Sequence, residues 1–148
     1  MYKHILIATD GSNLAGSAAS HGLSLASEHN AKVTIVTVTG IWSIVDIAAR
    51  TEAGETDAIQ KYEEFQVSMA NKILFETESK AKSLSLDFQT VHVKDKFPAD
   101  GIIDTAEQEN VDLIVMASHG RRGIQRALLG SVANEVVSRA TVPVLIYR

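Results

Sequence analysis

The sequence predicts an α/β fold: a doubly wound, five-stranded parallel sheet with helices on both faces and strand order 3-2-1-4-5. Short apolar segments rich in β-branched residues alternate along the chain with longer segments whose apolar residues recur at helical spacing. This alternation predicts parallel strands joined by right-handed helical crossovers, which place helices above and below the sheet. The 148 residues match the size of one domain and contain no repeat or linker, so we expect residues 1–148 to form a single domain.

Five short segments are predicted as strands. Each is dominated by aliphatic or β-branched side chains, whose stiff rotamers favour a pleated strand, and turn residues separate each from its neighbours. The predicted strands are His4–Ala8, Lys32–Val38, Phe88–Val93, Val111–Ala117 and Val142–Tyr147.

Four segments show the apolar spacing of an amphipathic helix. Asn30 suits a left-handed cap after the first of them, and Pro98 stands at the start of the third, where proline is tolerated. The stretch Thr39–Thr56 shows no clean period and contains Gly40 and Gly54, so it is predicted to be a loop or lid. The predicted helices are Asn13–His29, Asp57–Ser83, Phe97–Asn110 and Ser131–Ala140.

Composition narrows the class of protein. The chain has no cysteine, which excludes disulfides and thiolate metal sites. It also lacks a signal-peptide pattern, so a cytoplasmic protein is expected. No apolar run is long enough to cross a membrane. The formal net charge is −4, and the only basic cluster in the sequence is Arg121, Arg122 and Arg126. This cluster could equally be a solvated face. Nucleic acid is therefore not expected as the principal partner.

Two polar loops are predicted to meet at one edge of the sheet. In doubly wound sheets, ligands bind beyond the carboxyl ends of the strands where neighbouring connections run in opposite directions. With strand order 3-2-1-4-5, this point lies between the first and fourth strands. The first strand ends at Ala8-Thr-Asp10, and the fourth ends at Ala117-Ser-His-Gly120. Both loops are therefore expected to face the same crevice.

The loop after the fourth strand has the features of an anion-binding turn. It leads into a predicted helix, whose first N–H groups attract anions. Gly120 and Gly130 are expected to allow close approach of the backbone and a positive φ, and Ser131 to cap the helix or bind a phosphate oxygen. The alternative is that the glycines only form tight turns and Ser131 is only an N-cap. The loop matches neither the lysine-bearing P-loop nor the GxGxxG dinucleotide motif.

Three motifs together resemble the universal stress protein family from end to end. They are Ala117-x-x-Gly120 followed after nine residues by Gly130-Ser131, the segment Ile7-Ala-Thr-Asp10-Gly-Ser12, and the ending Val142-Pro-Val-Leu-Ile146. The ATP-binding branch of that family carries Gly-x-x-Gly-x(9)-Gly-Ser/Thr. Three of the four marked positions match, and Ala117 replaces the first glycine. An alanine keeps the backbone N–H but adds a methyl group and disfavours positive φ.

The resemblance implies a site for ATP and Mg²⁺. Asp10 would lie against the ribose and the metal, although it also fits a helix-capping carboxylate. Ala8 and Val38 would lie beside the adenine. The residues implied around the phosphates or lining the same pocket are Ala117, Ser118, His119, Gly120, Gly130, Ser131 and Val132.

The sequence leaves three classes of function open. No HExxH or GxSxG motif is present, which favours a nucleotide-responsive signalling or stress-adaptation module with, at most, slow ATP hydrolysis. An adenylating or ATP-pyrophosphatase-like enzyme would need a glycine-serine signature after the first strand, which Asp10-Gly-Ser12 only distantly resembles. A third alternative is a structural dimer module whose pocket is empty or holds AMP or cyclic AMP.

The last predicted strand suggests how the chain assembles. Val142–Tyr147 falls at a sheet edge and carries no inward charge to protect it, and such edges invite another strand. A twofold dimer with antiparallel pairing of this strand is expected, and the family resemblance suggests the same arrangement. The alternative is a monomer whose edge is covered by Thr39–Thr56 through Trp42 and Ile44.

Overall fold

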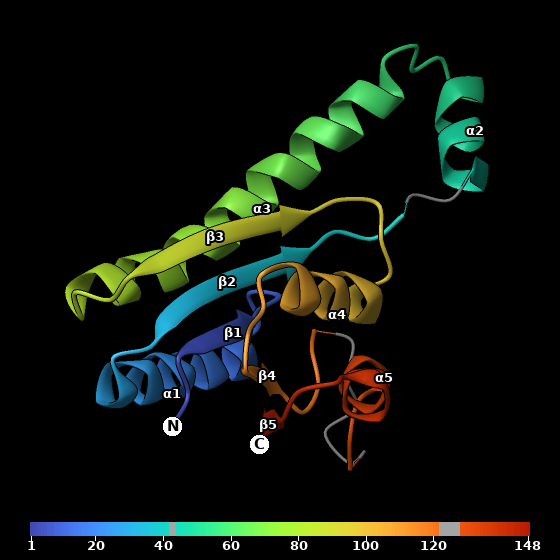
Figure 1. Cartoon of the computed structure of the whole chain (residues 1–148). Coiled ribbons are helices and arrows are strands. Elements are labelled where there is room, and N and C mark those ends of the chain that lie inside the picture. The colour runs from blue at the N-terminus through green and yellow to red at the C-terminus, as the bar shows by residue number, and fades with distance from the viewer. Residues whose placement is uncertain (42–43, 122–127) are drawn as a thin grey trace.

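The computed structural model describes residues 1–41, 44–121 and 128–148 and confirms the predicted sheet. The strands form one sheet of five in the order β3-β2-β1-β4-β5 (Figure 1). Every neighbouring pair is parallel. The strands are β1 (His4–Ala8), β2 (Lys32–Val38), β3 (Phe88–Val93), β4 (Leu113–Ala117) and β5 (Val144–Tyr147).

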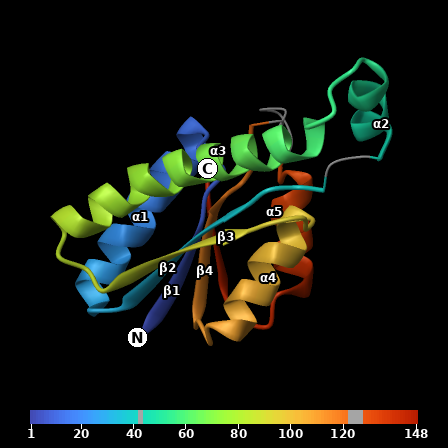
Figure 2. The ribbon, with the colours of Figure 1, turned by 90° about the horizontal axis from the view of Figure 1, so that it is seen from above.

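Helices cover both faces of this sheet. Figure 2 shows α1 and α3 on one side of the strands and α4 and α5 on the other. Among the helices of the described residues, none has both the length and the apolar character needed to span a bilayer. The helices are α1 (Asn13–His29), α2 (Ile44–Glu52), α3 (Ala58–Ser83), α4 (Pro98–Gln108) and α5 (Ser131–Arg139).

The core consists of two layers because strand side chains alternate between the two faces. On β1, Ile5 and Ile7 belong to the cluster with α1 and α3, whereas Leu6 and Ala8 belong to the cluster with α4 and α5. All four are buried, as the apolar sequence of a central parallel strand predicts. The first layer is close-packed: a β-carbon on Gly22 of α1 would lie 3.0 Å from Cδ1 of Ile7.

The prediction that Thr39–Thr56 is a loop is wrong, because this stretch contains helix α2. None of residues 45–52 is buried, and the flanking glycines suggested a loop. Figures 1 and 2 both place α2 beside the N-terminal end of α3 and away from β5. Helix α2 therefore does not cover the edge of β5; Trp42 lies outside the described residues.

Several boundaries differ by two residues from the prediction. Strand β4 begins at Leu113 rather than Val111, because the Val111 N–H donates to the carbonyl of Ala106 and so closes α4. Strand β5 begins at Val144 rather than Val142. The predicted left-handed cap at Asn30 is confirmed, with φ 51°.

Candidate functional site

The loops after β1 and β4 meet at the carboxyl edge of the sheet, and Asp10 joins them. Its Oδ1 accepts a hydrogen bond of 2.9 Å from the backbone N–H of Ser12 in its own loop. Its Oδ2 accepts a second of 2.9 Å from the backbone N–H of Arg121, which follows β4. The side chain is half-buried; the bond from Ser12 is partly shielded from water, and the bond from Arg121 is exposed. One carboxylate thus fixes the distance between two loops that are remote in sequence.

The start of the loop after β4 is anchored by backbone hydrogen bonds. The Ser118 N–H donates to the carbonyl of Tyr147 on β5 over 2.8 Å, and the Ser118 carbonyl accepts from the Gly130 N–H over 2.7 Å. The second bond closes the loop between residues 119 and 129 and ties its end to its beginning. The Ser118 hydroxyl, in a side chain only 4% exposed, lies 3.1 Å from Nδ1 of His119.

Gly120 and Gly130 stand where the chain has no room for a side chain. A β-carbon on Gly120 would overlap Oδ2 of Asp10. One on Gly130 would lie 3.1 Å from the carbonyl oxygen of Ser118 and 3.2 Å from Cα of His119. The expectation of positive φ at these two glycines is wrong: within the described ranges, the glycines in that region are Gly11, at 78°, and Gly54. Close approach of the backbone, rather than handedness, requires glycine in this loop.

Helix α5 begins without a side-chain cap. Gly130 is the N-cap residue, with φ −68° and ψ 164°, and Ser131 is the first helical residue, so the expected capping role of Ser131 is wrong. No acidic residue stands in the first turn. By contrast, α1 is capped by the hydroxyl of Ser12, which accepts from Ala15 N–H, so the alternative assignment of Asp10 as helix cap is also wrong. The first N–H groups of α5 therefore remain available to an anion at this edge.

Ala8, Val38 and Val132 lie on the same side of the sheet as α5. Ala8 is buried, and Val38 and Val132 are half-buried, at the margin of the cluster that faces α4 and α5. Gly101 of α4 makes room for Val38, because a β-carbon there would lie 2.7 Å from Cγ2 of Val38. The structure thus places these three predicted residues in the layer between the sheet and helices α4 and α5.

Ala117, the residue in place of the first motif glycine, directs its methyl group into the core. It is only 7% exposed and packs with Ala15, Ala18 and Tyr147. Its φ is not positive. The extra methyl group therefore lies under α1, and the backbone at this position does not need the left-handed conformation that favours glycine.

Metal ligands are sparse at this edge. Within the part of the chain that the structure describes, no group of three or more His, Cys, Asp or Glu side chains is placed to hold a metal ion. Asp10 supplies a carboxylate, and Arg121 is exposed beside it. Arg122 and Arg126 lie outside the described residues. A Mg²⁺ ion bound here would need most of its ligands from water and from phosphate oxygens, as is usual for this ion.

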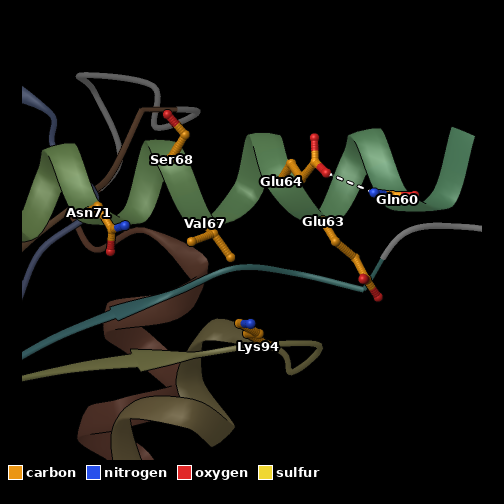
Figure 3. A pocket seen from close by; sticks show the side chains of 7 residues that line it. All are labelled: Gln60, Glu63, Glu64, Val67, Ser68, Asn71 and Lys94. Carbon is orange, nitrogen blue, oxygen red and sulfur yellow. Dashed lines mark hydrogen bonds between the residues drawn. The ribbon is translucent and has the colours of Figure 1, made fainter. Parts of the chain in front are cut away.

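A groove of about 610 Å³ lies elsewhere, between α3 and the end of β3. In Figure 3, Val67 and Asn71 of α3 point toward the strands, and Lys94 lies across from them. The other residues that line the groove are Gln60, Glu63, Glu64 and Ser68. The groove therefore contains none of the residues predicted for the site. The two joined loops, and not this groove, are where the sequence motifs converge.

Comparison with known proteins identifies the family. The family described as "Universal stress protein family" matches residues 1–148. The chain belongs to the universal stress protein family. Universal stress protein MJ0531 of Methanocaldococcus jannaschii is 32% identical over 148 residues, which cover 100% of this chain and 83% of that protein.

Solved structures agree with the fold. The structure of protein MJ0577 of the same organism has a TM-score of 0.78 and 27% identity, and the match covers 99% of this chain and 96% of that one. A universal stress protein crystallised in complex with cAMP has a TM-score of 0.69 and 25% identity, covering 99% and 97%. An adenine nucleotide is thus a ligand of at least one protein of this fold.

The residue patterns missed part of the site. Gly11 adopts φ 78°, and a β-carbon there would lie 2.7 Å from Cγ1 of Ile73, so α3 closes over the loop after β1. Asp-Gly-Ser is a turn sequence, which could have indicated the left-handed glycine. No spacing rule could have shown that α3 reaches this loop.

Proposed function

We propose that this chain binds ATP, together with Mg²⁺, in the crevice between the loops after β1 and β4, and that it acts as a nucleotide-responsive signalling module. The observation that carries the proposal is the Asp10 carboxylate, which holds the N–H groups of Ser12 and Arg121 at 2.9 Å each and so joins both loops. These loops follow the two strands whose connections leave on opposite faces, which is where such sheets bind ligands.

The residues of the crevice divide among the parts of the nucleotide. The phosphates would lie against Gly120 and the uncapped start of α5 at Gly130 and Ser131, since free N–H groups and an exposed hydroxyl are phosphate ligands. Ser118 and His119 would line the same turn. At the ends of β1 and β2, Ala8 and Val38 would lie beside the adenine. Ala117, at the end of β4, and Val132, in the first turn of α5, would flank the phosphate turn.

Asp10 is the carboxylate that would face the ribose and the metal ion. A bound Mg²⁺ would neutralise phosphate charge. Both carboxylate oxygens already accept a backbone hydrogen bond, which fixes their orientation, and a carboxylate oxygen has a further lone pair for a ligand. The ion would then be held chiefly through the nucleotide, with one protein ligand.

The proposed role is binding and not turnover. Bound nucleotide shifts an equilibrium only by its different affinity for two conformations or assembly states. The complex of a related protein with cAMP makes cyclic AMP the second candidate ligand for the same crevice. Competition between ATP and cAMP for this chain decides between them.

The test is isothermal titration calorimetry of the purified chain with ATP and Mg²⁺. Gly130→Val should abolish most of the affinity, because a β-carbon there would already lie 3.1 Å from Ser118 O and would push the turn away from the phosphates. Gly16→Val is the matched control, since no atom lies within 4 Å of a β-carbon at that position. Unchanged affinity in a folded Gly130→Val protein would contradict the assigned phosphate turn.

We further propose that the module is a homodimer formed by antiparallel pairing of β5, Val144–Tyr147, with its copy. Strand β5 is the last strand of the sheet, and its four residues are all half-buried, as expected of an edge that lacks a neighbour. Ile146→Lys should shift the mass measured by light scattering from dimer to monomer, with circular dichroism confirming the fold. Wild-type protein that is monomeric at tens of micromolar would refute the dimer.

A further inference from the structure

Arg121 is a cation whose backbone is anchored between the two joined loops. Its backbone N–H donates to Oδ2 of Asp10 at 2.9 Å, which anchors the residue directly after Gly120. Its guanidinium extends over the loop after β1: a β-carbon on Gly11 would lie 2.9 Å from Nη2 of Arg121. The missing side chain of Gly11 therefore leaves the space in which this guanidinium lies.

The guanidinium has no carboxylate partner among the described residues. Two other described arginines are paired with carboxylates: Arg139 lies 2.7 Å from Asp100, and Arg50 lies 3.8 Å from Glu55. The backbone of Arg121 contacts Asp10, yet both Asp10 oxygens accept from backbone N–H groups, and among the described residues no ion pair joins Asp10 to the Arg121 guanidinium. Its five N–H donors remain available to another anion.

The surroundings of Arg121 lack the acidic residues that usually stand at helix starts. Neither α1 nor α5 carries an acidic side chain in its first turn. Both helices begin at this edge and present the positive ends of their dipoles there. Although the chain has a net charge of −4, the guanidinium of Arg121 lies near two helix starts, and the nearby Asp10 carboxylate accepts hydrogen bonds from two backbone N–H groups. The local balance favours a polyanion over a neutral ligand.

We propose that Arg121 is the residue by which the crevice prefers a nucleoside triphosphate over nucleosides and nucleotides with fewer phosphates. This inference rests on the proposed function and assigns a part of it to a residue outside the glycine motif. A planar guanidinium binds phosphate oxygens through two parallel hydrogen bonds, which a lysine cannot reproduce. With its backbone held by Asp10, Arg121 extends toward the added phosphate groups without a large loss of chain freedom.

The experiment compares ATP and adenosine as competitors of a fluorescent ATP analogue on the full chain with Mg²⁺. Arg121→Gln should lower the affinity for ATP by about tenfold or more, the cost of a charge-assisted contact. The affinity for adenosine should stay within about twofold of wild type. Arg121→Lys should retain part of the preference. Arg50→Gln on α2 is the control, because it removes the same charge far from the crevice and should leave both affinities unchanged.

Each outcome decides one question. If Arg121→Gln lowers the affinities for ATP and adenosine equally, the residue only supports the loop, and the inference is overturned. An unchanged ATP affinity would overturn it as well, while leaving the proposed nucleotide site intact. A wild-type chain that binds neither the analogue nor ATP would refute the proposed function itself.

Discussion

Removal of the Asp10 carboxylate should destabilise the protein even without ligand, because that group joins the two loops. Asp10→Ala leaves the N–H groups of Ser12 and Arg121 without their acceptor, both at 2.9 Å in the native chain. A hydrogen bond to a charged group contributes about 1.5 kcal/mol at the low end, which suits a half-buried site that water can reach. Two such bonds give a loss of about 3 kcal/mol in the free energy of unfolding.

Urea denaturation followed by circular dichroism measures this loss. With a slope of about 2 kcal/mol per molar, the midpoint of Asp10→Ala should fall by about 1.5 M. Asp10→Asn is the informative control, because an amide keeps one acceptor oxygen and turns a donor toward the second N–H. It should cost about 1.5 kcal/mol, half of the alanine effect. An Asp10→Ala midpoint within about 0.2 M of wild type would refute the assigned role of this carboxylate.

Three further predictions concern stability. Gly16→Ala in α1 should raise the free energy of unfolding by about 0.5–1 kcal/mol, since no atom lies within 4 Å of the new β-carbon and alanine is the better helix former; a lower urea midpoint would contradict this. Ser12→Ala should lower the free energy of unfolding by about 1 kcal/mol, because α1 loses its N-cap. An unchanged urea midpoint would contradict the assigned cap. Burial, and secondarily Lys94, lowers the pKa of His92 below 6.5, and Asp95 opposes this shift. As the pH falls through 6.5, the unfolded chain therefore binds more protons at this residue than the folded chain does. The free energy of unfolding should fall with the pH in this range. The difference between urea midpoints at pH 7.5 and pH 5.5 should therefore shrink in His92→Gln, and a difference of the same size would exclude His92 as a contributor.

The elements that pack on the sheet could be predicted from the sequence, because burial imposes a pattern on them. Strand β1 is apolar from Ile5 to Ala8, since Ile5 and Leu6 face opposite helix layers. Helix α2 could not be predicted in the same way. None of residues 45–52 is buried, so no face of the helix had to be apolar.

The candidate site was predictable in its members but not in its contacts. The motif indicated Gly120 and Gly130, yet the reason for glycine is the nearby Asp10 carboxylate and the Ser118 carbonyl, which only the folded chain brings together. The contact between Asp10 and the Arg121 N–H joins loops from two different crossovers, and no local spacing encodes it. The direction of the Ala117 methyl group, into the packing with Ala15 and Ala18, likewise depends on how α1 lies on the sheet.

The central claim is that the crevice between the two joined loops holds an adenine nucleotide. Native mass spectrometry of the purified chain, mixed with Mg²⁺ and equal amounts of ATP, AMP and cyclic AMP, tests it most directly. The account predicts protein that gains the mass of one ATP per chain, and loses that adduct in Gly130→Val. Protein that stays free of every nucleotide at millimolar concentration would contradict it.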